Sequence, residues 1–229
     1  MKPLPVFIGY DGDAEPVAYH VCADSVIRNA SGPVAIIPLA LNTLKGEYTE
    51  RHDDGSNAFI YSRFLVPYLM DYAGTAVFLD GDMVVRGDVY ALVRAHWRNG
   101  GVAVSVVKHD YKTKQATKYL GAPNRDYPRK NWSSVIVWCC WASENRLLTP
   151  DMIERMTGAE LHRFSWLRDD RIGALPESWN RLVIEQEIRP KDELLHYTLG
   201  TPCFSDYSRC PGAEEWHKAA ALAFGHREP

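Results

Sequence analysis

Two acidic residues separated by a glycine, Asp80-Gly81-Asp82, form the pattern in this 229-residue chain that is best suited to chemistry. They directly follow the apolar run 75–79, whose residues are typical of a buried strand. Carboxylates at the carboxyl end of such a strand lie where open α/β sheets bind ligands. Mg²⁺ or Mn²⁺ held by one or two carboxylates keeps coordination positions open for phosphate oxygens. A plain acidic turn would look the same over these three residues alone, and the strand before them favours the metal site.

The composition limits the class of protein. The net charge is -3 and there is no cluster of Lys and Arg, so a dedicated nucleic-acid-binding protein is not expected. No stretch reaches the roughly 18–20 apolar residues that span a bilayer, and the first residues lack a signal-peptide pattern. Five cysteines, with Cys139 and Cys140 adjacent, predict buried thiols rather than a disulfide framework or a zinc site. A cytoplasmic protein without a transmembrane segment is expected, and peripheral membrane association stays open.

The apolar pattern predicts alternating strands and helices in a single domain. Strands are expected at 6–11, 34–39, 75–79, 102–107, 132–138 and 194–198, and helices at about 16–29, 58–72, 89–97, 149–157 and 211–224. Asp13 or Glu15 can cap the first helix, whose first turn contains Pro16. A bend is expected at Pro67 in the second helix. The strand-helix-strand order at the start of the chain predicts a right-handed parallel unit of the kind that binds nucleotides.

Two segments lack a clear period. Residues 42–57 are polar and rich in turn-forming residues, which fits either a mobile loop or a plain solvent-exposed connection. Residues 108–132 interleave aromatic and cationic side chains. That pattern suits the binding of sugars or phosphates, and it equally suits a solvated surface.

Several motifs, taken in order, resemble the GT-A glycosyltransferases, and most closely the retaining, nucleotide-sugar-dependent enzymes of family 8. The motifs are Tyr10-Asp11, Tyr61-Ser62-Arg63, the Asp-x-Asp segment 78–85, Asn131-Trp132-Ser133-Ser134 and His196-Tyr197-Thr198-Leu199-Gly200. The resemblance covers roughly residues 5–205. It implies an α/β GT-A fold, in which helices flank a Rossmann-like, mostly parallel central sheet. One domain would span 1–229, with a nucleotide-binding half at about 1–107 and an acceptor-side half at about 108–229.

The resemblance also implies roles for individual residues. Asp80, Asp82 and a neutral His196 would hold Mn²⁺ or Mg²⁺, a suitable set of oxygen and nitrogen ligands. The nucleotide sugar would contact Gly9, Tyr10, Asp11, Arg63, Asp80, Gly81, Asn131, Ser134 and Gly200. Each role has a structural alternative: a hydrogen-bonded core histidine for His196, a helix cap for Asp11, and a salt bridge with Asp80 for Arg63.

Catalytic roles are expected for Arg63 and for Asp169 or Asp170, one of which would face the anomeric carbon. Adjacent acids also fit the start of a helix. Which of the two acids would face the anomeric carbon stays open. Trp179-Asn180 fits either an acceptor wall or a buried tryptophan. The chain departs from the family at Thr201-Pro202-Cys203-Phe204, where members carry Lys-Pro-Trp. No diphosphate-binding lysine can therefore be assigned by the resemblance.

The expected function is metal-dependent transfer of a sugar from a nucleotide-sugar donor, UDP-linked, to a glycan or another hydroxyl acceptor. The resemblance implies retention of configuration. One alternative is a sugar nucleotidyltransferase, which would want a glycine-rich, basic phosphate loop after the first strand, whereas residues 12–15 are acidic. Another is a non-catalytic nucleotide- or sugar-binding protein of the same fold.

Overall fold

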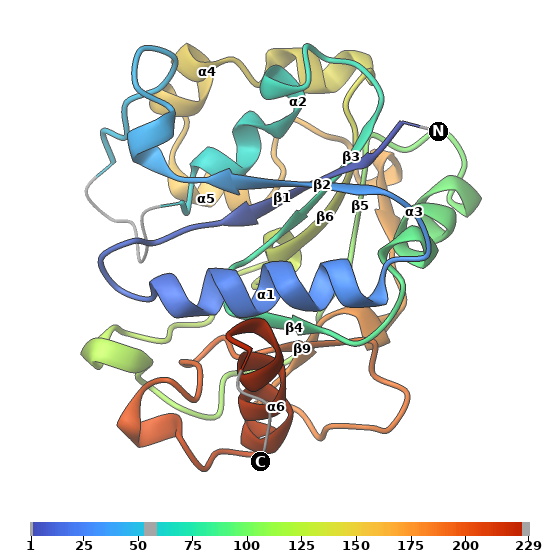
Figure 1. Ribbon diagram of the computed structural model, residues 1–229. Coiled ribbons are helices and arrows are strands. Elements are labelled where there is room, and N and C mark those ends of the chain that lie inside the picture. Colours follow the sequence, from blue (N-terminus) through green and yellow to red (C-terminus); the bar gives the residue numbers. More distant parts are fainter. Residues whose placement is uncertain (1, 53–58, 226–229) are drawn as a thin grey trace.

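A six-stranded sheet lies at the centre of the computed structural model, which describes residues 2–52 and 59–225 (Figure 1). Its strand order is β2-β1-β3-β6-β5-β7. The strands are β1 (Leu4–Gly9), β2 (Val34–Leu39), β3 (Thr75–Leu79), β5 (Val104–Val106), β6 (Val135–Cys139) and β7 (Ile172–Ala174). The pairs β1–β2, β1–β3 and β5–β7 are parallel, whereas β6 is antiparallel to both β3 and β5. The sheet is therefore mixed, and three of its five pairings have the expected parallel direction.

A second sheet of three strands has the order β4-β9-β8. It consists of β4 (Met83–Val85), β8 (Arg181–Leu182) and β9 (Leu194–His196). The turn Asp80-Gly81-Asp82 carries the chain from β3 of the central sheet to β4 of the small one. Because β4 and β9 pair with Met83 opposite His196, the end of β9 lies beside this turn.

Helices cover both faces of the central sheet. Alternate residues of a strand point to opposite faces, so Val77 packs with α1 (Pro16–Asn29) and α3 (Val89–Arg98), and Phe78 packs on the other side. That other side is covered by α2 (Val66–Leu69), α4 (Pro150–Arg155) and α5 (Gly158–His162) (Figure 1).

Helix α1 packs against both sheets. The helix lies between the central sheet and the pair formed by β4 and α6 (Ala213–Ala223) (Figure 1). Its Cys22 and Val26 are buried toward the central sheet, and Val21 packs against Trp216 of α6. Val21, Cys22 and Val26 are fully buried, whereas Val17 at the start of the helix is exposed.

Several elements are shorter than the apolar pattern predicts. The described part of the expected helix 58–72 contains a 3-10 turn, Ser62–Leu65, followed by the four residues of α2. Pro67 begins α2 instead of bending a longer helix, because proline is tolerated in a first turn. The expected helix 149–157 divides into α4 and α5, and a capping box of Thr157 with Glu160 starts α5.

The strand predictions fail at their ends. The 3-10 turn Trp132–Ser134 precedes β6, and β5 keeps only three of the six predicted residues, Val104–Val106. Residues 53–57 of the polar segment 42–57 lie outside the described residues. Within its described part, Leu44 and Tyr48 are buried in the core instead of facing solvent.

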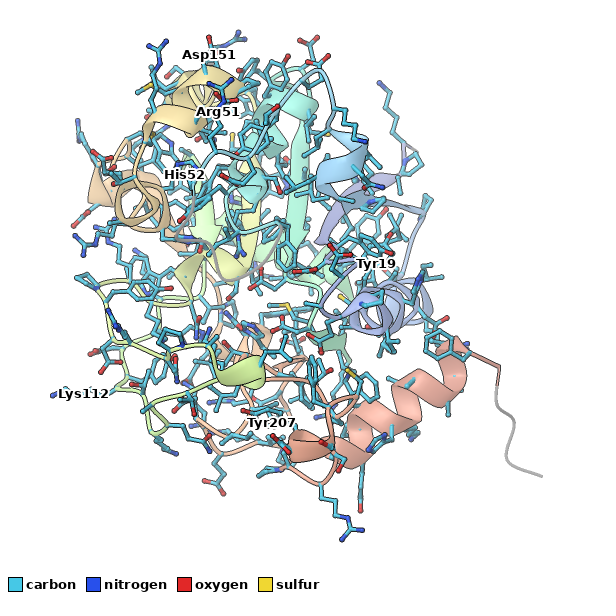
Figure 2. The ribbon with its side chains drawn as sticks, turned by 90° about the vertical axis from the view of Figure 1, so that its left-hand side faces the viewer. Tyr19, Arg51, His52, Lys112, Asp151 and Tyr207 are labelled. Atoms are coloured by element: carbon cyan, nitrogen blue, oxygen red, sulfur yellow. The ribbon has the colours of Figure 1, made fainter. Side chains whose placement is uncertain are left out.

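The basic segment 108–132 has little regular structure beyond a 3-10 turn, Tyr119–Gly121, and an isolated bridge between Thr117 and Pro123. Figure 2 shows Lys112 of this segment at the left-hand periphery of the molecule. The cysteines are all free thiols, as expected, but only Cys22, Cys139 and Cys140 are buried; Cys203 is exposed and Cys210 is half-buried. No helix in the described ranges is long and apolar enough to cross a membrane.

Candidate active site

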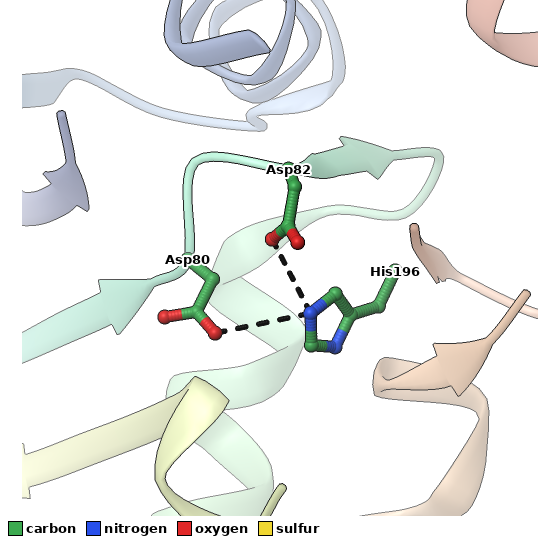
Figure 3. A group of neighbouring side chains, drawn as sticks. All are labelled: Asp80, Asp82 and His196. Atoms are coloured by element: carbon green, nitrogen blue, oxygen red, sulfur yellow. Dashed lines mark ion pairs between the residues drawn. The ribbon is translucent and has the colours of Figure 1, made fainter. Parts of the chain in front are cut away.

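The two acids and the histidine meet at the junction of the two sheets (Figure 3). Asp80 follows β3, Asp82 precedes β4 and His196 ends β9. One ligand atom from each side chain can be chosen so that all three lie within 4.8 Å of one another. The Nε2 atom of His196 is 3.2 Å from Asp82 Oδ1 and 3.8 Å from Asp80 Oδ2. All three side chains are largely buried.

The glycine between the acids has a steric role. A Cβ atom at Gly81 would lie 2.4 Å from the carbonyl oxygen of Gly9, at the end of β1. Any larger residue would force the two backbones apart, so the glycine lets the acidic turn pack directly against the first strand. This contact brings the metal-ligand candidates next to the segment that follows β1.

A buried amide fixes the orientation of the histidine. Asn180 donates from Nδ2 to Ser134 Oγ (2.7 Å) and to the carbonyl oxygen of Asn131 (3.3 Å). Its Oδ1 lies 2.9 Å from Nδ1 of His196. In the neutral imidazole, Nδ1 therefore carries the proton and Nε2 presents its lone pair to the two carboxylates. A lone pair facing two anions is unfavourable unless a cation lies between them, so the arrangement fits a metal ligand with a supporting outer partner.

The carboxylate oxygens also fit a cation. Among the described residues, Oδ1 of Asp80 and Oδ1 of Asp82 are buried and accept no hydrogen bond. Arg63 Nη1 approaches Asp80 Oδ1 to 2.7 Å, but as an ion pair without hydrogen-bond geometry. Two carboxylates and one imidazole form a ligand set suited to Mn²⁺, and carboxylates also suit Mg²⁺.

The two carboxyl groups differ in their electrostatics. Burial raises the pKa of Asp80 to about 6, with the negative charge of Asp82 adding to the shift and Arg63 opposing it. Burial also acts to raise the pKa of Asp82, but the neighbouring His196 and Lys118 together hold it below the ordinary range. The site is thus crowded with negative charge at neutral pH, which a divalent cation would stabilise.

Arg63 is buried and its guanidinium is held from several sides. Nε donates to the carbonyl oxygen of Ile60 (2.9 Å), and Nη1 donates to that of Ser133 (3.0 Å). The guanidinium carbon also lies 5.0 Å from the ring centre of Phe78. The structural salt bridge is therefore present, and Arg63 also lines the cavity around the acids.

A row of four cavities passes through the site, each sharing lining residues with the next. A cavity of about 630 Å³ lies where β1 and β2 end, and it shares Asp11 with one of about 20 Å³. That small cavity shares Asp82 with the metal cavity, of about 70 Å³. On its far side the metal cavity shares Lys118 and Tyr127 with one of about 440 Å³. We call these the first, linking, metal and outer cavities.

Most of the expected donor-binding residues line this row. Tyr10 and Asp11 border the first cavity, Gly9 and Gly81 border the linking cavity, and Arg63, Asn131 and Ser134 border the metal cavity. Gly200 lines none of the four.

Helix α1 begins without a capping hydrogen bond from the side chain at its N-cap position. Asp11 Oδ1 accepts from the backbone N–H groups of Asp13 and Ala14, which stabilises the turn that leads to α1. Glu15 occupies the N-cap position but makes no capping hydrogen bond. Its buried carboxyl instead accepts from the hydroxyl of Thr201, and burial raises the pKa of Glu15 to about 7.

The structure does not bring Asp169 or Asp170 to the site. They start a 3-10 turn just before β7, the edge strand of the central sheet, and neither lines any of the four cavities. Asp169 is 86% exposed and pairs with Arg129 at 2.5 Å; Asp170 is 58% exposed and pairs with Arg168. In this structure neither acid lies in the metal cavity, because β7 is separated from β3 by β5 and β6, and a role for one of them at the anomeric carbon stays a prediction.

Two functional candidates were not identified as such from the sequence. Asn180 was expected to belong to an acceptor wall or to accompany a buried tryptophan, and it instead supports His196. Lys118 was only one cation of the basic segment, and it lines both the metal and the outer cavity. Burial lowers the pKa of Lys118, while Asp82 and Asp80 oppose that shift. The position of Lys118 depends on an irregular loop, for which the sequence carries no periodic signal.

The fold defines the class: the chain has the GT-A fold of glycosyltransferases. It aligns over 99% of its length with the glycosyltransferase GlyE of Streptococcus pneumoniae TIGR4, with a TM-score of 0.61, 14% identity and 63% of that chain covered. The galactosyltransferase LgtC, solved with donor and acceptor sugar analogs, gives a TM-score of 0.57 at 15% identity over 96% of both chains. The bifunctional glycosyltransferase WbbM gives 0.60 at 17% identity, and 95% of this chain spans 51% of it. The expected GT-A fold is thereby confirmed.

No family model matches the chain. A curated relative does: Protein CDI of Arabidopsis thaliana is 40% identical over 223 residues, which are 94% of this chain and 85% of that protein. The chain belongs to the family of Protein CDI.

Proposed function

We propose that this protein is a metal-dependent glycosyltransferase that takes a sugar from a UDP-linked donor and transfers it to a hydroxyl group of a glycan or another acceptor. The observation that carries the proposal is the set formed by Asp80, Asp82 and the Nε2 lone pair of His196. This set lies within a GT-A fold, at the carboxyl end of a central strand, where open α/β sheets bind ligands.

The row of cavities suggests how the donor would be oriented when it is bound. The nucleoside would occupy the first cavity, beside Tyr10 and Asp11, and the diphosphate would lie at the metal cavity. The transferred sugar would then point toward the outer cavity. This order is supported by the shared lining residues, according to which the metal cavity lies between the first cavity and the outer cavity.

The chain's own residues prepare this site for a departing diphosphate. A cation bound by Asp80, Asp82 and His196 would act as a Lewis acid and stabilise the negative charge of the leaving group without a proton. Asn180 keeps the proton of the imidazole on Nδ1. Lys118 adds a positive charge to that of Arg63 at the border of the metal cavity, in a chain that lacks the late Lys-Pro-Trp lysine of the enzymes it resembles.

We propose retention of configuration at the anomeric carbon. An inverting enzyme needs a general base that deprotonates the acceptor. Among the described lining residues, the carboxylates of the metal cavity are the two candidate metal ligands, and Asp126 of the outer cavity accepts a hydrogen bond from the backbone of Thr113. The leaving diphosphate would therefore take the acceptor proton. Proton NMR of a fresh product made from an α-linked donor should show the α-anomer, and a β-anomer would contradict retention.

A panel of UDP-, GDP- and ADP-sugars, each with Mn²⁺ or with EDTA, tests the proposed function. One UDP-sugar should raise the melting temperature only with Mn²⁺, since a ligand at a hundred times its Kd stabilises the native state by about 2.7 kcal/mol. The same donor should be slowly hydrolysed. Stabilisation without hydrolysis or transfer would indicate a binding protein, and no Mn²⁺-dependent stabilisation by any member would contradict the proposal.

A further inference from the structure

The outer cavity is unusual in its charge. It has a volume of about 440 Å³. Its lining includes four cationic residues and one acidic residue: Lys118, Arg125, Lys130, Arg163 and Asp126. The first cavity shows the opposite balance, with three carboxylates and one lysine: Asp11, Asp13, Glu50 and Lys45. The two ends of the row of cavities therefore carry opposite net charge.

The cations of the outer cavity have no close ion-pair partner among the described residues, although carboxylates attract Lys118 and Lys130 from farther away. Within the described ranges, none of the four has a carboxylate oxygen within 4.0 Å, although Arg28, Arg94 and Arg171 elsewhere on the molecule each have one. The ammonium group of Lys130 is held by neutral acceptors, Oδ1 of Asn124 (2.5 Å) and the carbonyl oxygen of Arg125 (2.7 Å). An excess of positive charge in a concave site attracts anions.

The cavity also has walls that suit a sugar. Tyr61 and Tyr127 line it. A tyrosine offers an apolar ring face against which a sugar ring can pack, and a hydroxyl group that can form a hydrogen bond.

Arg125 and Arg163 border the outer cavity but not the metal cavity, whereas Lys118 borders both. Guanidinium groups match phosphate and carboxylate oxygens in geometry. The two arginines thus lie where they can hold an anionic group at a distance from the diphosphate.

Building on the proposed function, we propose that the outer cavity is an acceptor subsite for a sugar that carries an anionic group, a phosphate or a carboxylate. Arg125 and Arg163 bind this group, and the acceptor hydroxyl then faces the metal cavity. The transferred sugar could supply the same chemistry if it were a uronic acid. Its carboxylate would then belong to the donor, and the experiment separates these two sources.

Calorimetric titration of inorganic phosphate into the metal-free protein tests the subsite without any nucleotide. The test variant is Arg125→Gln with Arg163→Gln. The matched control is Lys112→Gln with Arg155→Gln, which removes the same charge from exposed residues outside the four cavities; Lys112 lies at the periphery in Figure 2. We expect saturable binding that weakens by at least about tenfold in the test variant, on the scale of lost charge-assisted contacts, and that changes little in the control. Absence of saturable binding to the wild type, or an equal effect in both variants, would overturn the proposal.

Titrations with UDP-glucose and UDP-glucuronate in the presence of Mn²⁺ identify the source of the anion. An anionic acceptor predicts that the test variant binds both donors as the wild type does. A loss confined to UDP-glucuronate would assign the arginines to the transferred sugar, and an equal loss for both donors would assign them to the diphosphate. Either result overturns the acceptor subsite. Failure of the proposed function would look different, because the wild type itself would then bind no donor with Mn²⁺.

Discussion

Replacement of Asn180 by alanine tests whether His196 is set up as a metal ligand. Asn180 is fully buried and connects Nδ1 of His196 (2.9 Å) with Oγ of Ser134 (2.7 Å). Asn180→Ala removes the acceptor that holds the imidazole proton on Nδ1. The proton can then move to Nε2, which lies 3.2 Å from Asp82 Oδ1 and would donate to that carboxylate instead of binding a cation.

Loss of an outer hydrogen-bond partner of a ligating histidine typically weakens metal binding by about 10- to 100-fold. This range corresponds to about 1.4–2.7 kcal/mol. Because a buried donor is also left without a partner, the free energy of unfolding should fall by about 1–3 kcal/mol. The assay is calorimetry of Mn²⁺ binding in the presence of UDP, at a temperature well below the melting temperature of each variant.

Asn145 offers a matched control. It is as fully buried as Asn180, and its Nδ2 donates to the carbonyl oxygens of Ala103 (3.0 Å) and Cys139 (2.9 Å), away from the four cavities. Asn145→Ala should lower the melting temperature without changing Mn²⁺ affinity. A folded Asn180→Ala protein with wild-type Mn²⁺ affinity would refute the reasoning. An equal loss of affinity in both variants would show that the assay reports general destabilisation.

Three further substitutions test other parts of the site. Because burial raises the pKa of Glu15 to about 7, the folded state holds its proton more tightly than the unfolded chain, and the free energy of unfolding falls as the pH rises from about 5 to 8. Glu15→Gln should remove up to about 3 kcal/mol of that decline in metal-free urea unfolding, and an unchanged slope would contradict the assignment. Lys118→Met should weaken binding of UDP with Mn²⁺ by about tenfold or more, while Lys114→Met should not; equal affinities would exclude contact with the diphosphate. Arg63→Ala leaves Asp80 buried without its ion-pair partner, so urea unfolding should show a loss of about 3–5 kcal/mol, and a loss below about 1 kcal/mol would argue against the buried pair.

The parts of the fold that the sequence predicts well are those with a strong local pattern. The run 75–79 is apolar after Thr75 and became β3, and the acids after it lie at the end of that strand as expected. The position of His196 was also predictable, because it follows a short apolar run that became β9. In each case a few neighbouring residues decide the element, and the element decides where the side chain points.

The parts that could not be predicted depend on contacts between distant segments. Asp169 and Asp170 have the residue type of catalytic acids, but the pairing of β7 at the sheet edge takes them away from the metal cavity. Asn180 meets His196 only because β8 and β9 pair side by side, with Leu182 opposite His196. Lys118 reaches the site on a loop without periodicity. No local pattern determines such a loop, which is why the sequence left its role open.

The most direct test of the metal site is calorimetric titration of UDP into the wild type, Asp82→Asn and Asp170→Asn, each with and without Mn²⁺. Asp82→Asn keeps the shape of the side chain and removes the charge of a candidate ligand, whereas Asp170→Asn removes a charge from an exposed acid outside the four cavities. We predict that the wild type and Asp170→Asn bind UDP with the same strong dependence on Mn²⁺, and that Asp82→Asn stays folded and loses this dependence. Wild-type Mn²⁺-dependent affinity in folded Asp82→Asn would contradict the metal site.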